Sequence, residues 1–275
     1  MQILIENILF DIAYRFLFVI KNKILKVLYY KYGYKWKFNQ IKLEIDGKLK
    51  KDSLIRISFA YLFRIKINNK YFLVFNNRTK KFQPVGGAYK FYKNEEIYLN
   101  ENLAVKSDDF IPLNQKTERD YRLLVKNKDL SKFIKRFNST NERETVKDLS
   151  REFIEEIFQT KILNREQFSE LSYTYCGRHI AEMTKDKYEH YELLFADIIN
   201  LRLNKKQEQL FKSLENKSSD KYIFATANQI KNYGIVHGTD SLDDNIANHT
   251  YKILSENIDE LVLKDKYRDI ITIEI

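Results

Sequence analysis

Five carboxylates lie close together in the middle of the chain, and their spacing suits the binding of a metal ion. Four follow one another at intervals of four residues and a fifth is adjacent: Glu144, Asp148, Glu152, Glu156 and Glu155. On a helix, residues four apart share one face, where like charges repel and lower helix stability. A cation offsets that repulsion, and Mg²⁺ or Mn²⁺ prefers such oxygen ligands. The alternative is a solvated acidic face that pairs with Arg143, Lys147 and Arg151.

The residues around these carboxylates predict a helix over about 141–158. An apolar line occupies the opposite face: Leu149, Phe153 and Ile157. Two capping boxes fit its start: Asn141 with Glu144, or Ser139 with Glu142. Within the helix, Arg151 can bind a carboxylate through two parallel hydrogen bonds and hold its rotamer.

Upstream, apolar and polar residues alternate as in β-strands. The clearest strand covers 55–67, and its more polar face carries Arg56, Ser58, Arg64 and Lys66. Shorter alternations predict strands at 41–45, before the turn pair Asp46-Gly47, and at 71–75. The segment 83–87, Gln-Pro-Val-Gly-Gly, is expected to be a break in the backbone rather than a strand.

The remaining elements alternate between strands and helices. Residues 88–138 are polar and weakly periodic, which indicates an insertion. Further on, we expect strands at 171–175, 188–199 and 221–225, and helices at 205–217, after a cap at Thr226 with Gln229, and over 242–256. Strands mixed with helices predict an α/β or α+β fold with a layered core.

The first 38 residues differ in character from the rest. Residues 2–30 are mostly apolar with a narrow polar stripe, which predicts one long hydrophobic to amphipathic helix. Residues 1–51 hold eleven Lys or Arg and four acidic residues, so most of the net charge of +10 lies there. A hydrophobic helix with a basic flank favours an anionic membrane surface, rather than duplex nucleic acid, as the binding partner. A helix packed on the rest of the protein is the alternative.

Composition excludes several classes of protein. With one cysteine, Cys176, the chain has no internal disulfide and no cysteine-built zinc site, which is typical of a reducing compartment. The four histidines show no metal-ligand spacing. Gly86-Gly87 lacks the following G-K-S/T of a phosphate-binding P-loop.

The acidic stretch resembles the signature of the Nudix family, G-x5-E-x7-R-E-U-x-E-E-x-G-U, in which U is aliphatic. Residues 151–156 read Arg-Glu-Phe-Ile-Glu-Glu and match R-E-U-x-E-E in full. Pro84-Val85-Gly86-Gly87 is similar to the turn that precedes the signature, and Glu144 resembles its earlier glutamate. The resemblance implies a Nudix-type α/β/α sandwich with a mixed sheet, here preceded by the long N-terminal helix. We therefore expect a membrane-associated segment over 1–38 and a Nudix domain over 39–275.

Three departures from the signature concern the loop that shapes the substrate site. Glu144 precedes Arg151 by seven positions where the family has eight, and Phe158 replaces the closing glycine. Gly87 precedes Arg151 by 64 positions where the family has 14. The basic residues of this rebuilt stretch are expected to meet phosphates, unless it is a solvated surface excursion: Lys90, Lys93, Lys106, Arg119, Arg122, Lys126 and Lys128.

A narrower resemblance covers roughly residues 50–235. Segments 57–65, 70–74, 77–78 and 83–90 look like the SMODS-associated Nudix branch, whose members lie beside cyclic-oligonucleotide synthases in bacterial anti-phage (CBASS) operons. This resemblance implies a sensor of a nucleotide signal that acts, with self-association, at the inner face of the cell membrane. One alternative is a Mg²⁺-dependent pyrophosphohydrolase that cleaves a nucleoside diphosphate linked to another group. The other is an interaction module with a relic signature.

The family resemblance also implies roles for individual residues. Catalysis would use Arg151, Glu152, Glu155 and Glu156. Mg²⁺ or Mn²⁺ would be held by Glu152, Glu155 and Glu156 together with Gly86. We also consider further residues as contacts to the ligand: Gly87, Arg64, Arg178 and Tyr191.

Overall fold

The computed structural model describes residues 33–108, 114, 117–185, 190–235 and 244–275, with positions 19–21, 23, 24, 27 and 28. The helix predicted over 2–30 lies largely outside these residues. In the part of the chain that is described, no helix is long and apolar enough to cross a membrane.

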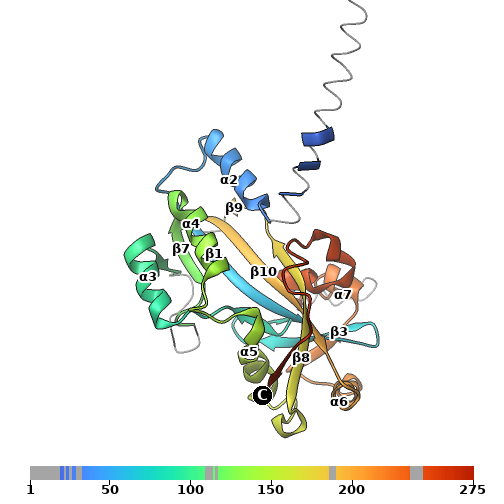
Figure 1. The fold of residues 1–275 in the computed structure, drawn as a ribbon. Coiled ribbons are helices and arrows are strands. Elements are labelled where there is room, and N and C mark those ends of the chain that lie inside the picture. Colours follow the sequence, from blue (N-terminus) through green and yellow to red (C-terminus); the bar gives the residue numbers. More distant parts are fainter. Residues whose placement is uncertain are drawn as a thin grey trace, which may run out of the picture.

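The described strands form two sheets that cross each other (Figure 1). In chain order the strands are β1 (Leu54–Arg64), β2 (Lys66–Ile67), β3 (Lys70–Asn76), β4 (Lys81–Gln83), β5 (Gly86–Ala88), β6 (Lys106–Ser107), β7 (Arg122–Lys126), β8 (Glu170–Ile180), β9 (Thr184–Lys185), β10 (Tyr191–Arg202), β11 (Tyr222–Ala225) and β12 (Ile271–Glu274). The larger sheet has the order β12-β8-β10-β1-β7-β6, with β5 beside β1 and β9 beside β10. The smaller has the order β11-β3-β2, with β4 beside β3.

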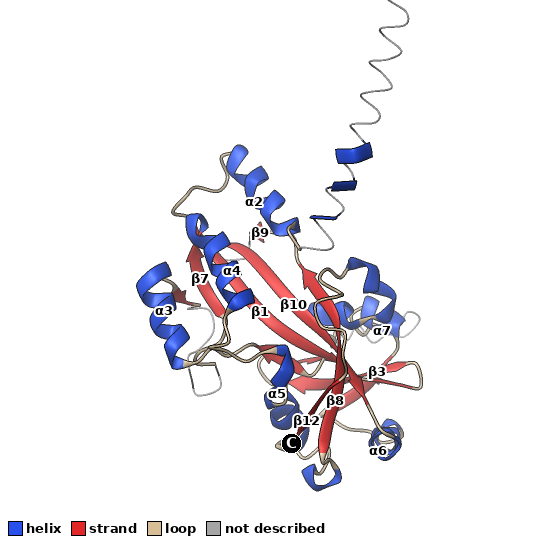
Figure 2. Cartoon of the chain, viewed as in Figure 1, coloured by secondary structure: helices blue, strands red, loops and turns tan. Residues whose placement is uncertain are grey.

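Helices lie around and between these sheets (Figure 2). They are α2 (Lys35–Ile45), α3 (Lys93–Leu103), α4 (Leu130–Ser139), α5 (Arg151–Phe153), the π-helix η3 (Ile154–Phe158), α6 (Lys205–Glu215) and α7 (Ala227–Lys231), with short 3-10 turns that include η2 (Val146–Asp148), η5 (Asn248–Ile253) and η6 (Ser255–Glu260). Because β1 and β10 are parallel and their other neighbours antiparallel, the larger sheet is mixed. The architecture is an α/β fold on a mixed, curled sheet.

The central strand β1 has two chemically different faces, as its alternation predicts. One face is fully buried: Ile55, Ile57, Phe59, Tyr61 and Phe63. The other carries Arg56, Ser58, Ala60 and Leu62, which line a cavity. The parallel register sets Leu194 and Ala196 of β10 beside Ser58 and Ala60, so both strands build the same surface.

Residues 88–138 add to the core and are not a solvated excursion. They supply β7, which pairs with β1, and α4, which buries Leu130, Phe133, Ile134 and Phe137 at helical spacing. The Phe137 ring stacks on Phe59 with a centroid distance of 3.6 Å, and Phe59 stacks on Phe195 of β10 at 4.4 Å. The weak periodicity of this stretch arose from its mixture of short strands, turns and helices.

The strand predicted at 41–45 is wrong, because these residues complete helix α2. Trp36 and Gln40, four residues apart, face the protein, and the Gln40 amide donates to the Asn127 side chain at 2.6 Å. The alternating Ile41 and Ile45 are 42% and 80% exposed. The alternation of apolar and polar residues over 41–45 therefore does not indicate a strand with one buried face.

The acidic helix is shorter than predicted. It begins at Arg151, and a capping box of Thr145 with Asp148 starts the 3-10 turn η2 instead of either predicted box. Glu144 therefore lies outside the helix, and the prediction that five carboxylates share one helical face is wrong. The apolar line is fully buried as predicted: Leu149, Phe153 and Ile157.

Other predicted elements are partly or wholly present. The predicted break at 83–87 contains the ends of two short strands, β4 and β5. Helix α7 has the predicted Thr226–Gln229 capping box. In place of the helix predicted over 242–256, the described part of that segment forms η5 and the start of η6.

Candidate functional site

A cavity of about 1130 Å³ lies between the larger sheet, the β3–β4 hairpin and the acidic helix. Its floor is the more polar face of β1. A carboxylate wall consists of Glu152, Glu155 and Glu156. A cation wall consists of Arg56, Arg78, Arg122 and Lys252, with His249 beside them.

Two glycines bring the backbone close to both β1 and the acidic helix. In strand β5, Gly86 and Gly87 pair with Leu62 and Tyr61. A Cβ on Gly86 would lie 2.2 Å from the Tyr61 carbonyl oxygen, and its φ of +148° is one that side chains rarely adopt. A Cβ on Gly87 would lie 2.0 Å from Glu152 Oε1. The second glycine therefore makes room for the first glutamate of the carboxylate wall.

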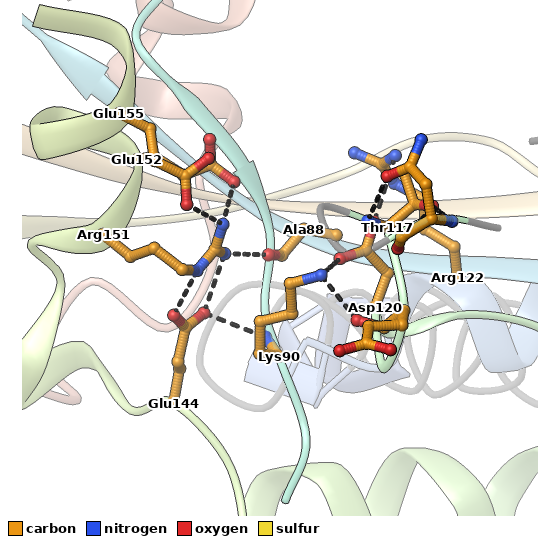
Figure 3. Close-up of polar contacts among 11 residues, drawn as sticks. Ala88, Lys90, Thr117, Asp120, Arg122, Glu144, Arg151, Glu152 and Glu155 are labelled. Carbon is orange, nitrogen blue, oxygen red and sulfur yellow. Dashed lines mark hydrogen bonds and ion pairs between the residues drawn. The ribbon is translucent and has the colours of Figure 1, made fainter. Parts of the chain in front are cut away.

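Arg151 connects three segments of the site (Figure 3). Its Nε donates to Glu144 Oε1 at 2.6 Å, and one terminal nitrogen donates to Glu152 Oε1, also at 2.6 Å. The other terminal nitrogen donates to the Ala88 carbonyl at 2.9 Å and to Glu144 Oε2 at 3.1 Å. Glu155 lies 3.7 Å from the guanidinium. Arg151 thus orients two carboxylates and ties the helix to β5.

The long insertion leaves and returns at one point beside this arginine. Glu144 N–H donates to the Lys90 carbonyl at 2.9 Å, and Lys90 N–H donates to the Glu144 carboxylate at 2.9 Å. One step further out, Phe91 forms an antiparallel bridge with Arg143. The residues between can therefore vary in number without moving Glu144 relative to β5.

Burial and mutual repulsion act on the carboxylate wall. Glu156 Oε2 accepts a hydrogen bond of 2.9 Å from Gly86 N–H. Burial, and next the charge of Glu152, hold the pKa of Glu156 well above its usual value. Burial also raises the pKa of Glu152, although Arg151 opposes that shift. These two carboxylates are therefore less stable as anions than carboxylates in water.

The last part of the acidic helix is wound as a π-helix, and its end is a core residue. Residues Ile154–Phe158 form this segment, which carries Glu155 and Glu156. Phe158, at the position of the family's closing glycine, is 9% exposed and packs edge-on against Phe153 and Phe168. The π-helical winding changes the direction of Glu156 relative to Glu152, and such segments are frequent at functional sites.

The donor set of the carboxylate wall fits a hard divalent cation in kind. It is not a preformed cluster, because within the described ranges no group of three His, Cys, Asp or Glu side chains is positioned to hold a metal ion. Glu152 is directed to Arg151, and Glu156 to Gly86 N–H. Binding of a cation would require these carboxylates to turn from their present partners.

The structure brings together part of the predicted site. Arg151, Glu152, Glu155, Glu156, Gly86 and Gly87 meet at one end of the cavity. Three predicted ligand contacts do not line it: Arg64, Arg178 and Tyr191. The Arg64 guanidinium donates to the carbonyls of Ile253 and Leu254, and Tyr191 is buried in β10. This placement gives no support to a contact between these three residues and a ligand in the cavity.

Arg178 belongs to a buried structural network. Its guanidinium binds Asp197 through two hydrogen bonds, at 2.8 and 2.9 Å. The Asp197 carboxylate also accepts from the hydroxyls of Tyr89 and Tyr175. Although burial alone would raise it, the pKa of Asp197 is held below its usual value by Arg178. A fully paired network of this kind holds β8 to β10.

Sequence reasoning missed most of the cation wall. Of the seven basic residues predicted to meet phosphates, Arg122 alone lines the cavity. Arg78 and Lys252 come from segments far apart in the chain, and no local pattern predicts that either residue contacts a phosphate. Tertiary pairing brings them together, since Phe82 of the hairpin forms a parallel bridge with Ile246. Arg56 was marked only by its place on the more polar face of a strand.

Comparison with known families agrees with this geometry. A family model described as the SMODS-associated NUDIX domain matches residues 54–254. The chain belongs to the SMODS-associated Nudix family. Every residue that lines the cavity lies within the matched region of the Nudix domain, whereas α2 lies before it. No curated protein and no solved structure matches the chain.

The close contact between Gly87 and Glu152 generates a prediction. Gly87→Ala should destabilise the Nudix domain by about 1–3 kcal/mol, because the new methyl group overlaps the Glu152 carboxylate. In a Glu152→Ala background, the same substitution should cost much less. Urea unfolding of the four proteins in this cycle measures the coupling. Equal costs in the two backgrounds would show that the glycine is not needed to accommodate Glu152.

Proposed function

We propose that the Nudix domain binds a nucleotide signal, a cyclic or linear oligonucleotide, in the cavity between its carboxylate and cation walls. The proposal rests chiefly on one observation: a single cavity joins the three glutamates of the carboxylate wall to the four cations of the cation wall, and Lys221 lines it as well. Its volume of about 1130 Å³ exceeds the roughly 300–1,000 Å³ of a typical small-molecule site. A ligand larger than a mononucleotide, with several phosphates, matches both the size and the charges. The association of the family with SMODS systems supports a nucleotide as the signal.

Mg²⁺ or Mn²⁺ is the proposed cofactor. Glu152, Glu155 and Glu156 would hold it, with the carbonyl of Gly86 nearby in sequence and space. When bound, such a cation neutralises charge on phosphate oxygens and lowers the pKa of bound water. Arg151 would keep Glu152 oriented, and Gly86 N–H would hold Glu156.

A second candidate function is hydrolysis of a nucleoside diphosphate linked to another group. The observation that favours it is the intact set of glutamates with an arginine that orients one of them. The long insertion and the core residue at the closing position of the signature separate this chain from the ordinary family pattern. We therefore propose sensing of a nucleotide as the first candidate function and hydrolysis as the second.

The proposed output is at the membrane. Residues 1–38 would contact an anionic membrane surface at the inner face of a bacterial cell, and copies of the chain would associate there. The support is the apolar composition of 2–30 and the concentration of basic residues in 1–51. Duplex nucleic acid is not an expected partner.

The nucleotide proposal is tested by direct binding. The full-length protein with Mg²⁺ is titrated with cyclic dinucleotides, cyclic trinucleotides and dinucleoside polyphosphates, and the recovered ligand is analysed. We expect at least one cyclic oligonucleotide to bind and to be recovered intact. Cleaved dinucleoside polyphosphates would favour the hydrolase instead. A panel that neither binds nor reacts would contradict both functions.

The raised pKa of Glu156 generates a prediction with a defined sign. Below the unfolded-state pKa of about 4.3, the carboxyl is neutral in both states and costs nothing. As the pH rises through the folded-state pKa, the buried charge lowers the stability of the folded protein. Glu156→Gln should therefore stabilise the metal-free protein on the order of 1 kcal/mol at pH 8, since each tenfold change in acid dissociation is about 1.4 kcal/mol.

The same variant should not gain stability at pH 4, and it should lose Mn²⁺ affinity, most severely when combined with Glu155→Gln. Thermal unfolding across pH and Mn²⁺ titration measure the two effects. Glu101→Gln, at an exposed position on α3, is the matched control. Unaltered Mn²⁺ binding in the double variant would show that the carboxylate wall is not the metal site.

Vesicle flotation tests the membrane proposal. Full-length protein should float with anionic vesicles, because each basic residue near such a surface contributes about 1 kcal/mol. It should float less with zwitterionic vesicles, and a chain that begins at Tyr34 should not float. Full-length protein that stays at the bottom of the gradient with every vesicle would contradict the proposal.

A further inference from the structure

Two cations of the cavity form no ion pair within the part of the chain that the structure describes. Lys252, in the 3-10 turn η5, is only 8% exposed and lines the cavity. Arg78 lies in the turn between β3 and β4 and lines the same cavity. Among the described residues, neither side chain forms an ion pair or a hydrogen bond. The charge of Lys252 has little access to water, which is costly unless something pairs with it, whereas Arg78 is exposed.

The neighbouring cations strengthen this imbalance. Arg56 pairs with Asp108 and Glu192, and Arg122 pairs with Asp120, so these carboxylates are already engaged. Burial lowers the pKa of Arg78, and the charges of Arg122 and Arg56 lower it further.

Burial also acts on the two least basic members of the group, Lys252 and His249, although the charge of Glu192 opposes the shift at Lys252. Burial lowers the pKa of Lys252, and it lowers that of His249 to about 4. The charges of Lys252, Arg122 and Arg78 contribute to the shift at His249. Cations from three separate segments thus repel one another across one cavity.

We infer that the cation wall is a phosphate subsite that binds its phosphate directly, independently of the divalent cation. Guanidinium groups match phosphate oxygens with two parallel hydrogen bonds, and a lysine adds a compact charge. A phosphate there would supply the missing counter-charge for Arg78 and Lys252. Ser58, on the floor of the cavity and paired in register with Arg122, adds a hydroxyl.

The spacing of the two walls limits the class of ligand. Along β1, Tyr61 pairs with Gly87 at the carboxylate wall, whereas Arg56 lies five residues away. At about 3.3 Å per residue this separates the two backbone positions by about 17 Å. Arg122, paired in register with Ser58, lies nearer to the carboxylate wall, at three residues from Tyr61. The ligand class is therefore a nucleotide with more than one phosphate, which rests on and narrows the proposed function.

The test uses inorganic tripolyphosphate with the full-length protein in EDTA, so that no divalent cation takes part. We expect calorimetric binding that weakens about tenfold or more in Lys252→Met and in Arg78→Gln. Lys80→Met is the matched control, because Lys80 lies in the same turn as Arg78 and does not line the cavity. It should bind as the parent does. Equal loss in Lys80→Met, or binding that appears only with Mn²⁺, would overturn the subsite.

Stability separates this role from a structural one. Removal of a buried, unpaired charge should leave Lys252→Met at least as resistant to urea as the parent while it loses phosphate binding. A variant that unfolds more easily would show that Lys252 serves the fold, and Arg78→Gln then decides the binding question alone.

The nucleotide panel separates the two proposals. Tripolyphosphate binding without any nucleotide binding would leave the subsite and remove the nucleotide signal. Nucleotide binding that Lys252→Met and Arg78→Gln do not change would leave the signal and remove the subsite.

Discussion

The guanidinium of Arg151 is the group on which the candidate site depends. It is shared between Glu144, Glu152 and the carbonyl of Ala88, so it fixes the acidic helix, the end of the insertion and strand β5 relative to one another. Glu144 is 8% exposed, and its carboxylate accepts two hydrogen bonds from this guanidinium. Removal of one member of a buried pair typically costs about 3–5 kcal/mol, because the other charge stays buried and unpaired. Arg151 thus sets the position of Glu152 in the carboxylate wall, while Gly86 N–H holds Glu156.

The same contact explains how a long insertion can interrupt a compact signature. The chain leaves β5 at Lys90 and returns at Glu144, and the two residues are joined through their backbones and the Glu144 carboxylate. Closing a longer loop adds little entropy cost, since that cost grows only with the logarithm of its length. The inserted residues also offset the entropy cost of their own ordering, because β7 extends the sheet and α4 covers it with Phe133 and Phe137. The insertion is therefore part of the fold that positions the cation wall through Arg122.

The extent to which sequence predicts this molecule depends on how local each signal is. The alternation over 55–67 predicted both faces of β1, and the match at 151–156 predicted the residues of the carboxylate wall. The helix start was mispredicted because several possible capping boxes overlap in 139–148. The local pattern does not decide which carboxylate accepts the hydrogen bond from the N-cap backbone. The helix at 35–45 was missed because it is stabilised by the burial of Trp36 in the tertiary structure, and the spacing of its apolar residues does not indicate a helix. Arg78 was marked only as part of the family resemblance at 77–78 and Lys252 by nothing, since only the pairing of Phe82 with Ile246 brings their segments together.

Charges of both signs lie in one cavity, and burial makes each sign unfavourable there. It raises the pKa of Glu156 and lowers that of Lys252, which are the directions expected when the charged form loses contact with water. The two groups do not relieve each other, because neither pKa shift has the other group among its causes. A ligand that carries phosphates and recruits a divalent cation neutralises both walls at once. Each charge that it brings makes the other more favourable, so cation and phosphate should bind with positive coupling. Binding of such a ligand would offset the cost of burying both kinds of charge and would therefore stabilise the folded domain.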